Sequence, residues 1–234
     1  MGLKAGLQEL KDVHSRFGFG AAVLFFCHRL INKIFYLERL NVIALDRDRL
    51  RPLKPNPGAT LTSRLATLQD LEALHPDPVW EVDEDKLRYF HDGDSCLLSY
   101  ADGKLAGYTW AHTLGRPELI PNLTISVPDS YLYNYAGLTL KEFRGVGLQP
   151  YRHHALLNHE KWQGKKGLLG YVKHLNFASR HGQEKSGYRT IGSIWMFGRA
   201  NNFRVYLSKS LRDMGIKRLR PLDPRTPPTA SIPY

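Results

Sequence analysis

Residues 131–149 read Tyr-Leu-Tyr-Asn-Tyr-Ala-Gly-Leu-Thr-Leu-Lys-Glu-Phe-Arg-Gly-Val-Gly-Leu-Gln, a tyrosine-rich strand pattern that breaks into a glycine turn. A helical pattern follows, with Pro150 near its first turn. Gly145 and Gly147 admit backbone angles that are closed to other residues, and the first helical turn has N–H groups without an internal partner. Arg144 adds a fixed positive charge. Such a turn attracts a phosphate, although most turns with this pattern only reverse the chain.

The net charge is concentrated at the two ends of the chain. The 234 residues have an ordinary globular composition, 42% hydrophobic and 24% charged, but carry a formal charge of +11. Residues 1–54 hold ten Lys and Arg against five Asp and Glu, residues 199–234 hold eight against two, and residues 55–198 hold fifteen of each. The basic excess is therefore separable from the chemistry of the balanced middle.

Cysteine usage and hydropathy predict a cytoplasmic protein. Cys27 and Cys96 stand in apolar surroundings without the spacing of Cys/His ligands, which predicts two buried, reduced thiols and no metal site. The uncharged run at 17–27 is far shorter than the roughly 20 apolar residues of a membrane span. No small-x-small cleavage site follows it, so it does not match a secretory signal.

An amphipathic helix is predicted near the N-terminus. Apolar residues recur there at helical spacing: Val23, Phe26, Leu30, Ile34 and Leu37. Within residues 20–40 this leaves two interpretations open, a helix that packs on the domain behind it and a basic helix on an anionic membrane surface. A short strand at 41–45 and a proline-rich loop at 52–58 follow. We expect residues 1–54 to form a basic N-terminal helical extension.

From residue 59 onward the pattern predicts a regular series of elements. These are a strand at 59–66, helices at 67–74 and 83–93, hairpin strands at 96–100 and 105–113, an exposed loop at 117–129, the strand at 131–140, a helix ending at Trp162, a strand at 168–173, a short helix at 176–187, a strand at 189–197, a helix at 203–214 and a proline-rich tail at 219–234. The helix after the glycine turn is predicted to face inward through one stripe: Leu148, Tyr151, Ala155, His159 and Trp162.

The order of elements and two motifs resemble the GNAT superfamily of acyl-CoA-dependent N-acyltransferases. The first motif, Arg144 to Leu148, is similar to the loop that holds the CoA diphosphate. The second resembles a downstream signature: Asn176, Ser179, Gly187, Tyr188 and Gly192. The resemblance implies an α/β (α+β) fold, with a central mixed, mostly antiparallel and splayed sheet flanked by helices, as a domain at 55–218. The N-terminal segment resembles extensions of some bacterial members.

The resemblance also implies a co-substrate and its contacts. Acetyl-CoA or another acyl-CoA would bind without a metal. The backbone of Leu138, Thr139 and Leu140 would hold its pantetheine arm. The diphosphate would bind to the loop residues: Arg144, Gly145, Val146, Gly147 and Leu148. Asn176 and Ser179 would line the pantetheine.

Two positions depart from the family pattern. Gln149 replaces the small residue at the end of the loop. Gln183 stands where many members carry a tyrosine that protonates the departing thiolate, and glutamine cannot perform that transfer.

Acyl transfer to an amine needs a base and a proton donor. Histidine as a residue type titrates near the required range, so His174, at the end of a strand, and His112, at the end of the hairpin, are chemically suited. Glu142 lies beside the loop, and Tyr133 is our first choice for the acid. Each also has an ordinary structural explanation, as a satisfied histidine, a solvated loop charge or a packed ring.

We therefore predict an acyl-CoA-dependent N-acyltransferase, an N-acetyltransferase in the simplest case, that acts on a primary amine of a small molecule such as an amino sugar or amino acid. The alternatives are a basic protein that binds nucleic acid or a membrane surface, and a CoA-binding domain with little catalysis. Aromatic residues are not interleaved with the basic flanks, which disfavours nucleic acid. Peripheral association with an anionic membrane and a homodimer both remain open.

Overall fold

The computed structural model describes residues 3–53, 58–113, 115, 117–120, 123–199 and 202–219. The helices are α1 (Leu3–Phe17), α2 (Phe19–Ile31), α3 (Leu68–Leu74), α4 (Glu84–His91), α5 (Leu148–Asn158), α6 (Phe177–Lys185) and α7 (Lys209–Asp213). The strands are β1 (Tyr36–Asp46), β2 (Leu61–Leu65), β3 (Ser95–Ala101), β4 (Lys104–His112), β5 (Glu118–Ile120), β6 (Leu123–Ile125), β7 (Tyr131–Thr139), β8 (Gly167–Lys173), β9 (Arg189–Arg199), β10 (Asn202–Leu207) and β11 (Arg218–Leu219). Most of the tail predicted at 219–234 lies outside the described residues.

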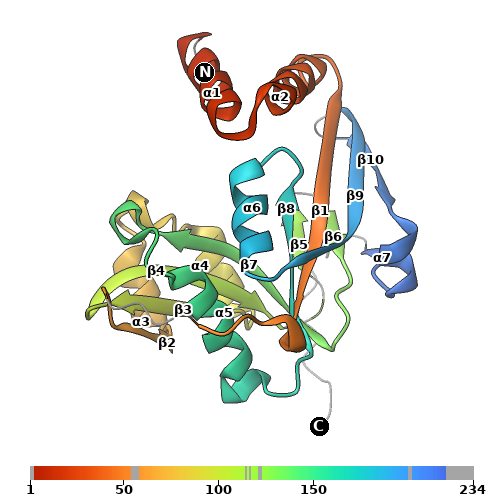
Figure 1. The fold of residues 1–234 in the computed structure, drawn as a ribbon. Coiled ribbons are helices and arrows are strands. Elements are labelled where there is room, and N and C mark those ends of the chain that lie inside the picture. The colour runs from red at the N-terminus through yellow and green to blue at the C-terminus, as the bar shows by residue number, and fades with distance from the viewer. Residues whose placement is uncertain are drawn as a thin grey trace.

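One large sheet organises the fold (Figure 1). Within the described residues its strand order is β10-β9-β1-β8-β7-β4-β3-β2. The pair β7–β8 is parallel, and the other neighbours are antiparallel. The prediction of a mixed, mostly antiparallel sheet flanked by helices is confirmed. β1, although it comes from the N-terminal segment, lies in the middle of the sheet between β8 and β9.

Helices and a small second sheet cover the two faces of the large sheet. On one face, Leu156 and Leu157 of α5 pack with Leu132 and Leu168 of the central strands. On the other face, α3 and α4 cover the β3–β4 side, while α7 and the sheet β11-β6-β5 cover the β1–β9 side. α1 and α2 lie beyond one end of the large sheet, above α6 in Figure 1. This end is also where β8 finishes.

Local signals placed several elements correctly. Thr67 and Asp70 form a capping box at the start of α3, because each side chain accepts from the backbone N–H of the other residue. Asp83 caps α4 by accepting from the N–H of Lys86. The β3–β4 hairpin turns at Asp102 and Gly103, which have φ values of 50° and 76°. Positive φ at both positions matches the twist of a tight hairpin, so this turn was readable from sequence.

The helix predicted at 20–40 is wrong at its C-terminal end. α2 stops at Ile31, and Leu37 already belongs to β1. Asn32 ends the helix because its side chain accepts from the N–H of Leu37 and donates to the carbonyl oxygens of His28 and Leu37. The apolar spacing continued past this point, but side-chain bonds to the backbone favoured a turn. The N-terminal segment also contains α1, which the sequence pattern did not predict.

Two further expectations about secondary structure are corrected. The loop predicted at 117–129 contains β5 and β6, which pair with each other and, through β6, with β11. The helix predicted at 203–214 is the edge strand β10 followed by the short α7. Its first half is a strand because Val205 and Leu207, two residues apart, both face the core beside β9.

The inward stripe of α5 also differs from the prediction. Leu148 and, after the helix, Trp162 are buried as expected, but Tyr151, Ala155 and His159 are only partly buried. The buried positions within the helix are Leu148, Arg152, His153, Leu156 and Leu157. Two of these buried positions are polar, Arg152 and His153, so apolar periodicity alone does not predict this face.

Cys27 is exposed, whereas Cys96 is buried as predicted. Both were expected to be buried because their neighbours in sequence are apolar. For Cys27 that inference is wrong because its whole face of α2 is turned to solvent.

Asp46 joins the ends of three strands and gives a pH-dependent test of the fold. Its carboxylate accepts from the hydroxyl of Tyr131 at 2.5 Å and from Arg189 Nη2 at 2.9 Å. Burial acts to raise the pKa of Asp46, but these two hydrogen bonds outweigh it and hold the pKa below its ordinary value. Stability from this carboxylate is therefore present above the unfolded pKa near ~3.9 and is lost as the pH falls through the folded pKa.

We expect Asp46→Asn to lower the free energy of unfolding by about 1 kcal/mol at pH 7, and the difference from wild type to shrink below about pH 4. Urea unfolding across this pH range measures the loss at pH 7 and its decrease at low pH. Asp48→Asn, at an exposed position nearby, is the matched control and should have little effect at either pH. A difference that stays constant down to pH 2.5 contradicts the assignment.

Candidate functional site

The two parallel central strands separate halfway along their length. β7 and β8 pair from Tyr131↔Gly167 to Tyr133↔Leu169, and both strands continue beyond the last pair. At the next position the two backbones are still close, because a Cβ on Gly170 of β8 would lie 2.8 Å from the carbonyl oxygen of Asn134 in β7. The expected splay is therefore present, and it opens toward the C-terminal ends of both strands.

A bulge in β7 turns its backbone toward this opening. The register between β4 and β7 shifts between Tyr108 and Trp110, and Ala136 has a φ of 45°. Ala136 and Gly137 are exposed although they lie on a central strand. A bulge next to an opened strand pair re-aims backbone groups, and such features are common at active sites.

Arg152 fixes the bulge from the α5 side. Its guanidinium is buried and donates to the carbonyl oxygen of Tyr108 at 2.7 Å, to the carbonyl oxygen of Leu138, and to the hydroxyl of Thr139 at 2.7 Å. Burial lowers the pKa of Arg152 to about 10. The arginine thus ties β4 and β7 together where their ladder is irregular, next to the backbone of Leu138 to Leu140.

The glycine turn leads from the opened strand into α5. Gly145 and Gly147 have φ values of 88° and 83°, in the region that favours glycine. Gly147 is the N-cap of α5, which has no side-chain cap. A Cβ on either glycine would meet no atom of the described residues within 4 Å. The turn is therefore open toward solvent, with the first N–H groups of a helix beneath it.

The other loop residues surround this opening. Arg144 is exposed and makes one long hydrogen bond, from Nε to the carbonyl oxygen of Thr139 at 3.4 Å. Glu142 is exposed in the short turn before the loop. Leu148 is buried and Val146 partly buried against the core. Pro150 has no N–H, so it removes one of the donors that a helix start would otherwise offer.

His112 belongs to a hydrogen-bonded cluster on the other side of β7. Its Nδ1 lies 2.6 Å from Asp94 Oδ1, and the other oxygen of Asp94 accepts from the hydroxyl of Tyr135. Tyr133 stacks on Tyr135 with ring centroids 5.6 Å apart. Burial raises the pKa of Tyr133 well above its ordinary value, and Tyr171 and Asp94 add to the effect. Both tyrosines therefore remain protonated donors.

His174 lies apart from this cluster, after the end of β8. Its N–H donates to the carbonyl oxygen of Arg39, and its Nδ1 is buried without a partner among the described residues. Burial lowers the pKa of His174, and the charges of Arg39 and Arg180 lower it further, so the ring is neutral at pH 7. Asn176 caps α6 by accepting from the N–H of Ser179.

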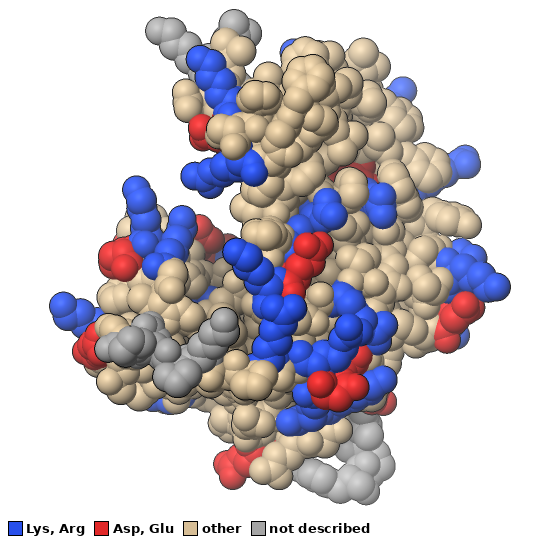
Figure 2. All heavy atoms as spheres, in the orientation of Figure 1, with Lys and Arg blue, Asp and Glu red and all other residues tan. Residues whose placement is uncertain are grey.

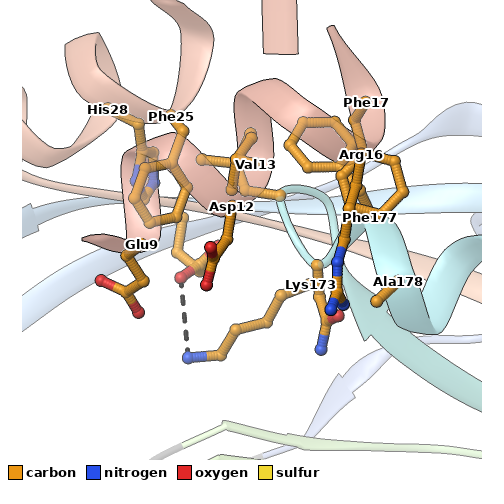
Figure 3. Close-up of a pocket in the computed structure, with 13 residues that line it drawn as sticks. Glu9, Asp12, Val13, Arg16, Phe17, Phe25, His28, Lys173, Phe177 and Ala178 are labelled. Carbon is orange, nitrogen blue, oxygen red and sulfur yellow. Dashed lines mark ion pairs between the residues drawn. The ribbon is translucent and has the colours of Figure 1, made fainter. Parts of the chain in front are cut away.

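A pocket of about 590 Å³ lies where α1 and α2 meet the ends of β8 and β1 and the start of α6 (Figure 3). Its acidic lining consists of Glu9, Asp12 and Glu38, and Glu38 lies 3.8 Å from Lys173. Aromatic rings line other parts of it: Phe17, Phe25 and Phe177. The surface below α1 is visibly hollowed in Figure 2. The pocket therefore combines carboxylates with an apolar wall at the splayed end of β8.

The predicted residues thus lie in three separate groups along β7 and β8. The first is the loop with Glu142 and Leu138 to Leu140, the second is His112 with Tyr133, and the third is His174 with Asn176 and Ser179. Among the residues that the structure describes, no group of three or more His, Cys, Asp or Glu could hold a metal ion. No helix of this part of the chain is long and apolar enough to cross a membrane.

Three residues of this region were missed from sequence: Glu38, Asp94 and Arg152. Asp94 follows the predicted end of a helix and directly precedes the hairpin that carries His112, which was the available signal. Arg152 and Glu38 had none, because their roles depend on contacts with strands far away in the chain.

No protein-family model and no curated protein matches the chain. Several solved structures are similar to it. A conserved protein of unknown function from Staphylococcus epidermidis has 13% identity and a TM-score of 0.49, over 77% of this chain and 68% of that one. A tandem GNAT protein from the clavulanic acid biosynthesis pathway has 18% identity and a TM-score of 0.44, over 69% and 52%. A GCN5-related N-acetyltransferase from Kribbella flavida has 12% identity and a TM-score of 0.45, over 76% and 66%. The chain spans about half the length of the tandem protein.

Proposed function

We propose that the chain is an acyl-CoA-dependent N-acyltransferase of the GNAT superfamily that transfers an acetyl or similar acyl group to a primary amine of a small molecule. One observation carries the proposal. The parallel pair β7–β8 opens after Tyr133↔Leu169, and the opened strand runs into a glycine turn and an uncapped helix start. This arrangement offers a slot between two strands and an anion site at its end.

The residues present fit an acyl-CoA. The open space above Gly145 and Gly147 and the N–H groups at the start of α5 suit a diphosphate, and exposed Arg144 supplies charge. The exposed backbone at Ala136 and Gly137 suits the amide groups of a pantetheine arm. Because Pro150 removes a donor, we expect a narrower diphosphate cradle than a regular helix start provides. When bound, the acyl-CoA supplies a thioester carbonyl.

Within this proposal His112 is the base. The Asp94 carboxylate lies 2.6 Å from its Nδ1 and fixes the orientation of the imidazole ring. His112 takes a proton from the ammonium form of the acceptor, and the free amine is the nucleophile. The hydroxyl of Tyr133, kept protonated by burial, is the donor for the leaving sulfur in place of the tyrosine that Gln183 replaces.

The pocket below α1 lies at the end of β8, apart from His112, and is our candidate for holding a part of the acceptor other than its reacting amine. Arg16 and Lys173 also line the pocket, and Glu9 and Glu38 form ion pairs with Arg29 and Lys173, so Asp12 is the carboxylate best placed to attract a cationic group. The aromatic wall suits an apolar part of the same molecule. Within the Glu38–Lys173 ion pair the carboxylate is the more buried partner, with the Glu38 side chain 12% exposed and that of Lys173 59% exposed. An amino acid or amino sugar is small enough for a pocket of about 590 Å³.

Binding and turnover test the proposal separately. Saturable thermal stabilisation by acetyl-CoA is expected from linkage, by roughly 2.7 kcal/mol at a hundredfold excess over Kd. A panel of amines with acetyl-CoA should then release free thiol for at least one acceptor class. Stabilisation without turnover would favour a CoA-binding domain with little catalysis. No stabilisation at millimolar acetyl-CoA would refute the donor assignment.

Asp94→Asn tests the assignment of His112. We expect kcat to fall about 100-fold with little change in acetyl-CoA affinity, because the variant removes the carboxylate that orients the base. Asp92→Asn, an exposed aspartate two positions away, is the control and should keep kcat. A kcat for Asp94→Asn within threefold of wild type would exclude His112 as the base.

A further inference from the structure

An entire face of α2 is apolar and turned to solvent. We call it the α2 face, and it consists of Phe19, Gly20, Val23, Leu24, Phe26, Cys27, Leu30 and Ile31. All eight residues are exposed, whereas the other five positions of the helix are partly or fully buried. At 100° per residue the eight span an arc of about 160° without one charged group.

Packing on the rest of the protein does not account for this face. Within α2, all of whose residues are described, Ala22 alone is fully buried. Phe19 is 73% exposed, and Ile34, just beyond the helix, is 92% exposed. The helix is anchored from its opposite side, where His28 Nε2 lies 2.7 Å from the carbonyl oxygen of Leu37. A contiguous apolar surface of this kind on a folded domain marks an interaction site.

The charged residues near the α2 face favour an anionic partner. Residues 13–37 contain no Asp or Glu, and of their three cations Lys33 is exposed, Arg29 is paired with Glu9 at 3.1 Å, and Arg16 lines the pocket below α1. The region of α2 at the top of Figure 2 is a tan expanse with basic and a few acidic side chains at its margins. In a symmetric pair of copies packed through this face, these cations would face their own equivalents. An anionic surface would instead be attracted to them.

We propose that the α2 face docks on an anionic lipid surface. The 13 residues of α2 extend about 20 Å, too short for a hydrocarbon core of about 30 Å, so the helix lies in the plane of the interface. Its apolar arc enters the acyl boundary, and Lys33 remains at the level of the headgroups. This docking does not depend on the proposed acyltransferase activity.

Vesicle sedimentation of the full chain tests the contribution of the apolar side chains of the α2 face to lipid binding. We expect binding to vesicles of equal phosphatidylcholine and phosphatidylglycerol that is at least about tenfold stronger than to phosphatidylcholine alone. Phe19→Ser combined with Phe26→Ser should weaken binding by about tenfold or more. The control combines Val79→Ser and Leu53→Ser, at apolar side chains 57% and 41% exposed elsewhere, and should bind like wild type. Circular dichroism checks that both variants fold.

A second pair of variants tests the charge. Lys33→Glu should reduce the preference for anionic vesicles severalfold, whereas Lys104→Glu, on the exposed β3–β4 hairpin, should not. Equal or absent binding of wild type to the two vesicle types would overturn the proposal. So would a wild-type dimer that the Phe19→Ser, Phe26→Ser variant converts to a monomer, because a second copy would then cover the face.

Discussion

A Gly147→Glu variant is expected to fold and to bind acetyl-CoA at least about 100-fold more weakly than wild type, a loss of roughly 2.7 kcal/mol. Gly147 is the N-cap of α5, and a side chain built there projects into open space rather than into the core. A carboxylate at this point would occupy the volume where a diphosphate would bind and would repel it. Isothermal titration with acetyl-CoA measures the change.

The control for this variant is Gly215→Glu. Gly215 has a φ of 79°, close to the 83° of Gly147, and a Cβ there also meets no atom of the described residues within 4 Å. Both substitutions therefore carry a similar backbone strain of about 1 kcal/mol, but only one lies at the loop. Similar melting temperatures with a large difference in acetyl-CoA affinity are the expected pattern. Equal affinities in two folded variants would remove the loop from the proposed site.

An Arg152→Met variant is expected to be less stable than wild type by about 2 to 3 kcal/mol, or roughly 5–10 °C in Tm. It leaves the carbonyl oxygens of Tyr108 and Leu138 and the hydroxyl of Thr139 without their donor. Removal of the buried charge offsets part of this loss, since burial already lowers the pKa of Arg152 to about 10. Urea and thermal unfolding measure the effect.

Arg144→Met is the matched comparison for Arg152→Met. Arg144 is exposed and has one hydrogen bond of 3.4 Å, so its loss should change stability by less than about 0.5 kcal/mol. It should weaken acetyl-CoA binding about five- to tenfold instead, through the lost charge. The two variants thus distinguish the roles of the two arginines, because Arg152 supports the bulge of β7 and Arg144 is expected to contact the ligand. A Tm for Arg152→Met within 2 °C of wild type would contradict the structural role.

Positions with strong local chemistry were predictable from the sequence. The capping box at Thr67 and Asp70 and the Asp102-Gly103 turn are decided by contacts within a few residues. The same holds for the glycine turn, where two positive φ values required glycine. The segments that failed, at 20–40 and 203–214, carried apolar residues whose spacing fits a helix, while a distant strand or a side-chain bond decided the outcome.

The sequence by itself determined the turn, the start of α5 and the alternation of helices and strands, because these depend on backbone freedom and local hydrogen bonds. Only the tertiary structure decided which strands are neighbours, where β7 and β8 separate, and that Asp94, His112 and Tyr135 form one cluster. It also decided that the apolar arc of α2 faces outward, since hydrophobic periodicity gives a helix an apolar face but does not say what covers it.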